Sequence, residues 1–301
     1  MEIMTKQQQT LAMRVLCALA GVLVVGWIAG TFCDLQFDQA IYAPDNGLVI
    51  VWSTFGLIPL ALPLCLFLGV LLQHCWEEAQ GLLRFGGSAV CILLSLVTGV
   101  LGMRSILGSD GIGKLLPFEI PTVGWVVCGV LTCIVLMAIG FRAGRRNEEA
   151  DLARRLIVVV VALALSFVIV EIVKNFMCRP RFRTLVLGHE GIEFAPWYKR
   201  TSGTKELIAQ FGLSSDAFKS FPSGHSVQVG VIFASFYGLC LLYPSLRDKW
   251  NVALVLQVVI MLSVMVCRMV LGAHFLSDVS VGALIGVVAD IVVLRWLAPV
   301  V

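Results

Sequence analysis

Charged side chains are scarce in this sequence: Asp, Glu, Lys and Arg make up 14% of its 301 residues, whereas hydrophobic residues make up 59%. Soluble globular domains carry about 25% charged residues. The mean hydropathy is +0.94. This composition excludes an ordinary soluble domain and indicates a polytopic membrane protein, for which the lipid bilayer is the surrounding partner.

Long hydrophobic runs take the place of charge. A helix needs about 20 apolar residues to cross a bilayer, because its backbone polar groups must be satisfied internally. Eight stretches meet this condition: 11–32, 48–73, 88–107, 122–141, 156–177, 223–243, 252–272 and 277–298. We therefore predict an all-α fold, a transmembrane bundle of about eight helices. The first stretch could instead be a signal peptide, but its long apolar run without an evident cleavage site favours an anchor.

Metal-ligand patterns are also missing from the sequence. Most of the ten cysteines fall inside the apolar stretches, where they act as small hydrophobic side chains. The sequence has no Cys-x-x-Cys pair and no Cys/His ligand spacing, which argues against a structural zinc site. The net charge of +3 identifies no partner, and we expect no nucleic-acid ligand.

The distribution of basic residues predicts the orientation of the chain. Segment 142–155 holds five arginines, and loops of this kind face the cytoplasm. Counting crossings from there places both termini in the cytoplasm and segment 33–47, which has no Lys or Arg, outside. Segment 178–222 also falls outside despite its many basic residues, for which a phosphate-binding surface is a separate reason. We expect the plasma membrane, with segment 178–222 on the extracytoplasmic face.

Two of the four histidines occur in short sequence motifs that suggest catalysis. His274 and Asp278 are four residues apart, so on a helix the carboxylate can accept a hydrogen bond from one imidazole nitrogen. This would fix the tautomer and raise the basicity of the other nitrogen, which could then attack phosphorus. The alternative is a simple capping pair at an exposed turn.

The second motif is Pro222-Ser223-Gly224-His225 at the start of an apolar stretch. Ser223 is suited to cap a helix, and Gly224 leaves room for an anion to approach the backbone. A helix N-terminus attracts anions, so His225 would stand beside a bound phosphate and exchange protons with it. Taken alone, this motif is also typical of an ordinary helix start.

Cations come from three further places in the chain. Lys174, Arg181 and Arg268 would neutralise the oxygens of a transferred phosphoryl group. Lys174 could instead extend to the membrane interface, whereas Arg268 lies within an apolar stretch, where a charge is costly unless it is functional. For Arg179 and Arg183 we expect a solvated or headgroup-facing position.

These residues, in this order, resemble the type 2 phosphatidic acid phosphatase (PAP2) superfamily. The three motifs of that family read Lys-x6-Arg-Pro, Pro-Ser-Gly-His and Ser-Arg-x5-His-x3-Asp, and the likeness covers roughly residues 171–290. The resemblance implies that His274 forms a phosphoenzyme with Asp278 as its partner, that His225 is the acid/base, and that no metal or other cofactor is needed. It implies phosphate binding by Lys174, Arg181, Ser223, Gly224 and Arg268.

Three departures from the family pattern stand out. Phe182 replaces the proline that follows the motif arginine, and Cys267 replaces the serine before Arg268, which removes a hydroxyl donor. Family members commonly have six membrane helices, whereas this sequence predicts about eight. Adding two helices preserves the side of the membrane on which the site opens.

The motifs divide the chain into two predicted parts. Residues 1–154 would contain the first four helices and the basic cytoplasmic loop, and they carry no catalytic motif. Residues 155–301 would form the PAP2-like catalytic core, with helices five to eight and the extracytoplasmic loop 178–222. A long loop between bundle helices is typical of a functional lid.

The first functional hypothesis is therefore an integral-membrane phosphatase with a lipid phosphate as substrate. Phosphatidate, phosphatidylglycerol phosphate and polyprenyl diphosphates such as undecaprenyl diphosphate all suit these residues. A phosphotransferase, in which an alcohol replaces water, is the second hypothesis. A transporter or channel with a His, Asp and Arg pathway is the third. The oligomeric state stays open.

Overall fold

The computed structural model describes residues 3–108, 111–149 and 151–297, and every regular element within these ranges is helical. The helices are α1 (Lys6–Ile41), α2 (Gly47–Phe55), α3 (Ile58–Glu77), η1 (Leu83–Gly87), α4 (Ser88–Leu107), η2 (Ile112–Leu115), α5 (Thr122–Arg145), α6 (Leu152–Met177), α7 (Phe182–Leu185), α8 (Thr204–Phe211), η3 (Ser215–Phe218), α9 (Gly224–Gly230), α10 (Ile232–Leu242), η4 (Pro244–Lys249), α11 (Trp250–Val270) and α12 (Leu276–Leu297). Over the same ranges, seven segments are long and apolar enough to cross a membrane, or up to eight with the bent pair α9–α10. The prediction of an all-α membrane bundle of about eight helices is confirmed.

The helices follow the apolar stretches closely, with two interruptions. Stretch 48–73 is divided at Gly56 into α2 and α3, and stretch 223–243 is divided at Val231 into α9 and α10, which are bent by 43°. α1 extends beyond its predicted start because the Thr5 side chain and Gln8 form a capping box. A helix ends where a cap or a packing contact stops it, so hydropathy alone locates the spans but not their breaks.

The break between α9 and α10 has specific hydrogen-bond partners. The side chain of Gln257 on α11 accepts from Phe233 N at 2.8 Å and donates to the Gly230 carbonyl at 2.9 Å. The carboxylate of Asp290 on α12 accepts from Ala234 N at 2.7 Å. These bonds satisfy backbone groups that the break leaves without helical partners, which a membrane-embedded helix requires.

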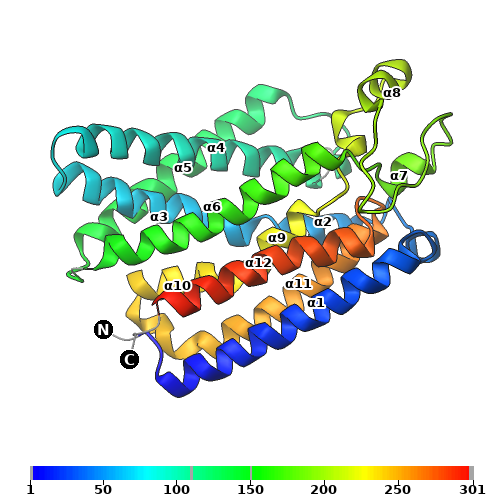
Figure 1. Cartoon of the computed structure of the whole chain (residues 1–301). Helices are drawn as coiled ribbons and strands as arrows, with labels where there is room; N and C mark the ends of the chain where they lie inside the picture. Colours follow the sequence, from blue (N-terminus) through cyan, green and yellow to red (C-terminus); the bar gives the residue numbers. More distant parts are fainter. Residues whose placement is uncertain (1–2, 109–110, 150, 298–301) are drawn as a thin grey trace.

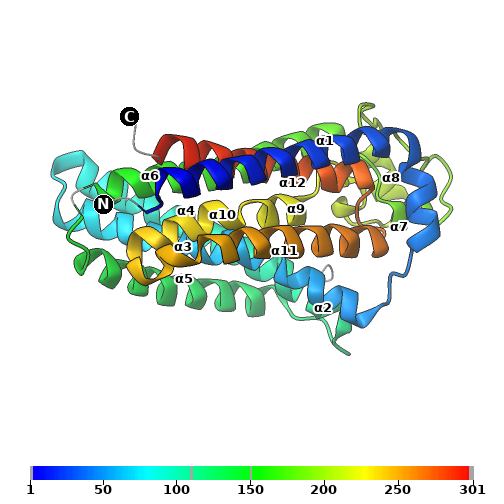
Figure 2. The same ribbon diagram turned by 90° about the horizontal axis from the view of Figure 1, so that it is seen from below.

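The broken helix lies in the middle of the bundle. In Figures 1 and 2, α9 and α10 run between α3 and α6 on one side and α11 and α12 on the other, and α1 lies outside α11 and α12. α9 and α12 touch at Gly230 and Gly286, where a Cβ on Gly286 would come within 2.7 Å of Gly230. Glycine at this crossing therefore allows the two backbones to meet.

The two ends of the bundle differ in character. α1 begins and α12 ends at one end, where the α5–α6 connection with its arginines also lies (Figure 1). The end of α6, the start of α9 and the turn between α11 and α12 lie at the other end, under segment 178–222. The three motif segments therefore converge at one end of the bundle.

Candidate functional site

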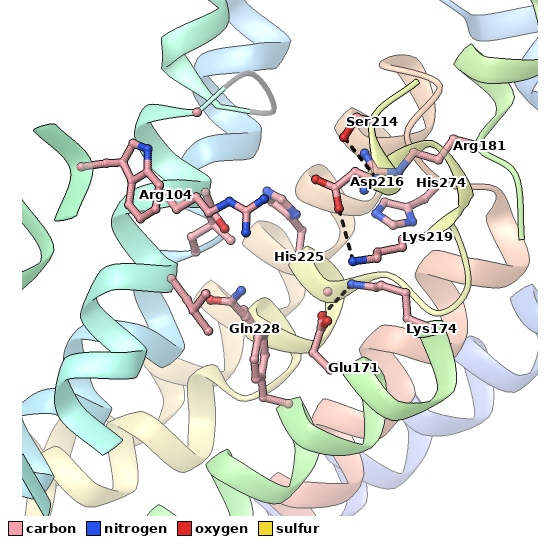
Figure 3. A pocket seen from close by; sticks show the side chains of 17 residues that line it. Arg104, Glu171, Lys174, Arg181, Ser214, Asp216, Lys219, His225, Gln228 and His274 are labelled. Atoms are coloured by element: carbon pink, nitrogen blue, oxygen red, sulfur yellow. Dashed lines mark hydrogen bonds and ion pairs between the residues drawn. The ribbon is translucent and has the colours of Figure 1, made fainter. Parts of the chain in front are cut away.

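A polar cavity of about 350 Å³ opens at the end of the bundle where the motif segments meet. Lys174 and Arg181 line it from the end of α6 and the following segment, and His225 lines it from the start of α9 (Figure 3). His274 reaches it from the α11–α12 turn. Arg104 of α4, which belongs to none of the sequence motifs, points into the same cavity toward His225. This cavity is called the polar pocket below.

The His274 imidazole is held by a backbone carbonyl. Its Nδ1 lies 2.6 Å from the carbonyl oxygen of Ser220, and the side chain is buried. A carbonyl only accepts hydrogen bonds, so Nδ1 carries the proton and Nε2 keeps a lone pair. Burial, and then the positive charges of Arg268 and Arg181, lower the pKa of His274 well below its usual value of 6.5. The ring is therefore neutral near pH 7 and has a nucleophilic nitrogen.

Asp278 does not bond to His274, so the expected direct contact between them is wrong. Its Oδ1 accepts from Arg179 at 2.5 Å, and its Oδ2 accepts from the Ser220 hydroxyl at 2.5 Å and from Phe275 N at 2.8 Å. The spacing of four residues predicted a shared helix face, but His274 precedes the first turn of α12. Ser220 links the two groups instead, because its hydroxyl bonds the carboxylate and its carbonyl bonds the imidazole.

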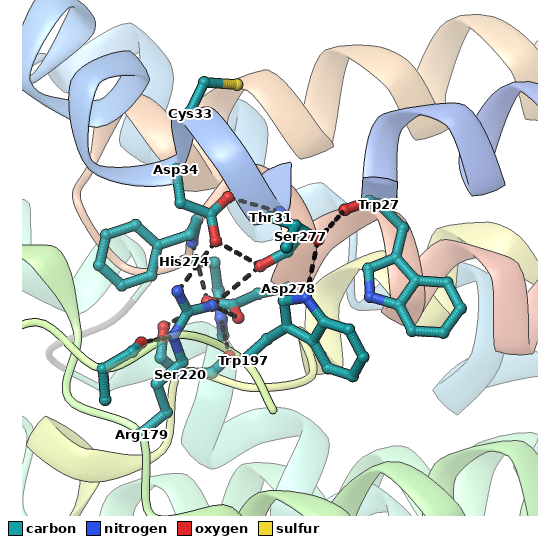
Figure 4. Close-up of polar contacts among 12 residues, drawn as sticks. Trp27, Thr31, Cys33, Asp34, Arg179, Trp197, Ser220, His274, Ser277 and Asp278 are labelled. Carbon is teal, nitrogen blue, oxygen red and sulfur yellow. Dashed lines mark hydrogen bonds and ion pairs between the residues drawn. The ribbon is translucent and has the colours of Figure 1, made fainter. Parts of the chain in front are cut away.

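Arg179 occupies a position opposite to the one expected for it. From the sequence we expect it in solvent or among headgroups, but its side chain is fully buried and bonds Asp278, Ser277 and Asp34 (Figure 4). Its guanidinium carbon lies 4.3 Å from the centre of the Phe275 ring. A buried guanidinium needs such partners to offset its desolvation. A buried cluster of ion pairs around Arg179 therefore supports the pocket, and the sequence motifs did not reveal it.

Asp34 brings helix α1 into this network. Its Oδ1 accepts from Ser277 N at 2.9 Å, and its Oδ2 accepts from Arg179 at 2.9 Å and from the Ser277 hydroxyl at 2.5 Å. Asp34 closely follows the apolar stretch 11–32, and an acid so close to an apolar stretch was the sequence signal for a buried partner. α1 therefore supports the turn that carries His274, although it belongs to the half of the chain without motifs.

The remaining predicted residues lie around the pocket as follows. Lys174 Nζ donates to the Glu171 carboxylate at 2.9 Å, so Glu171 offsets the charge of the lysine. Arg268 is buried, and its carbonyl accepts from His274 N at 3.3 Å. The Ser223 hydroxyl caps α9 by accepting from Ser226 N at 3.3 Å, as predicted.

Gly224 has a packing reason in addition to the predicted backbone access. A Cβ at this position would lie 3.0 Å from Lys174 Nζ. The absence of a side chain therefore leaves the space in which the lysine ammonium faces the polar pocket.

The two residues that depart from the family motifs, Phe182 and Cys267, are both buried. Phe182, in place of proline, is buried and packs edge-on against Tyr42 and Phe275, with ring centroids 5.1 and 6.2 Å apart. Cys267, in place of serine, is buried on α11. Phe182 thus joins the aromatic packing that surrounds the α11–α12 turn.

Acidic, His and Cys side chains do not gather as a metal centre would need: across the described ranges, no group of three or more is placed to hold an ion. Comparisons of the whole chain with curated proteins and with solved structures gave no match. A sequence model of the PAP2 superfamily matches residues 155–300, which contain all three motif segments. The C-terminal half of this helical membrane protein therefore belongs to the PAP2 superfamily.

Proposed function

We propose that this protein hydrolyses a lipid phosphomonoester or a lipid pyrophosphate, without a metal, through a phosphohistidine on His274. Members of the PAP2 superfamily are phosphatases, which supports a hydrolase of phosphoric esters in general. The apolar helices support a substrate that resides in the bilayer. Phosphatidate, phosphatidylglycerol phosphate and polyprenyl diphosphates are the candidate substrates.

The observation that carries the proposal is the imidazole of His274 in a pocket lined by cations. The Ser220 carbonyl holds the proton on Nδ1, and the lowered pKa keeps the ring neutral. Arg181 and Lys174 line the same pocket. A phosphate dianion drawn to these charges would meet a nitrogen lone pair, which is the geometry that nucleophilic attack requires.

The chemistry follows in two steps. His274 Nε2 forms a bond to phosphorus while the bond to the leaving oxygen breaks, and protonated His225 gives that oxygen a proton. Lys174, Arg181 and Arg268 offset the charge on the three equatorial oxygens. In the second step neutral His225 takes a proton from water, whose oxygen attacks phosphorus, and the N–P bond breaks to release phosphate and restore the imidazole.

The proposed orientation places the polar pocket on the extracytoplasmic side of the plasma membrane. The arginines of the α5–α6 connection lie at the opposite end of the bundle, and basic loops favour the cytoplasm (Figure 1). A lipid would then present its headgroup to the pocket from the outer leaflet.

The test is phosphate release by the purified protein in lipid nanodiscs with EDTA present. Phosphatidate, phosphatidylglycerol phosphate and undecaprenyl diphosphate are supplied in parallel. We expect at least one to be hydrolysed, with loss of both turnover and covalent phosphate labelling in His274→Ala. His74→Ala is the matched control, because His74 lies near the end of α3 outside the polar pocket.

Three other results would overturn parts of the proposal. Labelling that persists in His274→Ala refutes the nucleophile. Loss of activity with EDTA refutes the metal-free reaction. Release that requires an added alcohol, with the phosphate recovered on that alcohol, would replace the hydrolase by a phosphotransferase.

A further inference from the structure

A second cavity, of about 210 Å³, lies beside the polar pocket and is lined almost entirely by apolar side chains. Most of its lining residues belong to α3, α4 and α6. Its lining includes Leu64 of α3, Thr98 and Leu101 of α4, and Ala164 and Phe167 of α6. We call this cavity the apolar groove.

The apolar groove is continuous with the polar pocket. Leu101, Ser105, Phe167 and Gln228 line both cavities. Arg104, next to Ser105 in the sequence, lines the polar pocket only. Along α4 the surface thus changes within about one helical turn from a cation to apolar side chains. An amphipathic molecule with an anionic head and an apolar chain matches this change.

The length of the groove along α4 matches the thickness of the hydrocarbon region of one leaflet. Its lining residues on α4 run from Leu94 to Ser105 at spacings of three and four, which is one face of the helix. Eleven residues of helix span about 16 Å, and half of a hydrocarbon core is about 15 Å. Leu94 and Val97 are 43% and 55% exposed, so this face is open to the surrounding bilayer.

We propose that the apolar groove binds the hydrocarbon chain of the lipid whose phosphate occupies the polar pocket. This inference rests on the proposed function and specifies its substrate: the chain enters between α4 and α6, toward the bilayer midplane. Ala164 sets the width of the groove, because a large side chain there would fill the space between α4 and α6.

The first experiment compares chain lengths in a groove-filling variant. Ala164→Trp is assayed with dioleoyl and dibutanoyl phosphatidate, and with undecaprenyl and isopentenyl diphosphate. We expect kcat/KM for the long-chain substrates to fall by at least about tenfold, the factor that about two buried methylene groups contribute, with short-chain substrates unchanged. Leu165→Trp is the matched control, because Leu165 is 53% exposed and does not line the groove.

A second pair of variants guards against misfolding of the first. Thr98→Trp fills the groove from α4, and Leu93→Trp is its control on the exposed side of the same helix. Equal activity of Ala164→Trp and Thr98→Trp on long and short substrates, at wild-type level, would overturn the groove proposal and leave the phosphatase intact.

The second experiment does not depend on turnover. A phosphatidate with a diazirine in its acyl chain is photolysed in nanodiscs, and the crosslinked peptides are mapped by mass spectrometry. We expect crosslinks on the groove faces of α4 and α6 that Ala164→Trp removes and Leu165→Trp keeps. Such crosslinks without hydrolysis of any substrate would refute the proposed function alone, whereas crosslinks confined to other helices would refute the groove.

Discussion

Asp34 of α1 and Arg179 form a buried ion pair, with 2.9 Å between the Asp34 Oδ2 and an Arg179 terminal nitrogen. The two residues are 145 positions apart, and both side chains are at most 2% exposed. Arg179 in turn bonds Asp278, which bonds the Ser220 hydroxyl. The first helix therefore contributes to the position of the loop and turn that hold His274.

Asp34→Asn should weaken both stability and turnover. Removal of one charge leaves the buried guanidinium of Arg179 with less compensation, and breaking a buried pair costs about 3 kcal/mol. We expect a lower thermal unfolding midpoint in detergent and a reduced kcat. Asp45→Asn is the control, because Asp45 pairs with Lys114 at an exposed position. A wild-type midpoint and kcat in Asp34→Asn would show that the pair does not support the site.

The helices could be predicted from the sequence because crossing a bilayer requires long apolar runs, and these are visible without knowledge of the fold. The convergence of the motifs could also be predicted, because an even number of crossings returns the chain to the same face. The break at Val231 could not, since its hydrogen-bond partners Gln257 and Asp290 come from other helices.

The contacts within the site could not be predicted from the sequence either, because their partners are a backbone group or come from distant parts of the chain. The partner of His274 is a backbone carbonyl at Ser220, and every residue type has a backbone carbonyl. Arg179 was placed at the surface because its partner Asp34 lies 145 positions away, beyond the first apolar stretch. Residue type and spacing thus identified Lys174, Arg181, Gly224, His225 and His274, which line the polar pocket, but neither Arg104 nor the network behind the pocket.

The lowered pKa of His274 predicts an unusual pH dependence of phosphoenzyme formation. The imidazole attacks only when neutral, so the rate is lost as pH falls through its pKa, which lies well below 6.5. We expect labelling in single-turnover assays to persist down to pH values below 6.5. In Arg268→Met one of the nearby positive charges is lost, so the pKa rises and the acid limb moves to higher pH. Comparison of the two proteins cancels the ionisation of the substrate, and coincident limbs would contradict the assignment.

Gly224→Ala should displace the ammonium group of Lys174. The new methyl group would lie 3.0 Å from Nζ, and the flexible lysine can move away from it. A charge-assisted hydrogen bond contributes about 1.5–3 kcal/mol, so we expect a rise in KM of about 10-fold or more. Gly21→Ala is the control, because a Cβ there meets nothing within 4 Å. An unchanged KM would indicate that Lys174 does not bind the substrate phosphate.

Arg104 should distinguish diphosphate from monophosphate lipids. It lies where the polar pocket meets the apolar groove, and the phosphate closest to the chain would be found there. We expect Arg104→Ala to raise KM for undecaprenyl diphosphate by about tenfold, the effect of one charged hydrogen bond, with a smaller change for phosphatidate. Arg104→Lys should recover part of the loss. Arg84→Ala is the control, because Arg84 lies over the Trp76 ring, away from the pocket. Equal effects on both substrates would contradict the prediction.

The orientation is tested with two single cysteines in a background free of native cysteine. Ser202 lies in the exposed part of segment 178–222, and Asp248 lies at the opposite end of the bundle in η4. In intact cells a membrane-impermeant maleimide should label Ser202→Cys, whereas Asp248→Cys should need permeabilisation, because the proposed orientation places the arginine-rich α5–α6 connection in the cytoplasm. The reverse pattern would place the polar pocket inside the cell, and the lipid would then have to come from the inner leaflet. The same pair of cysteines therefore decides which leaflet supplies the substrate.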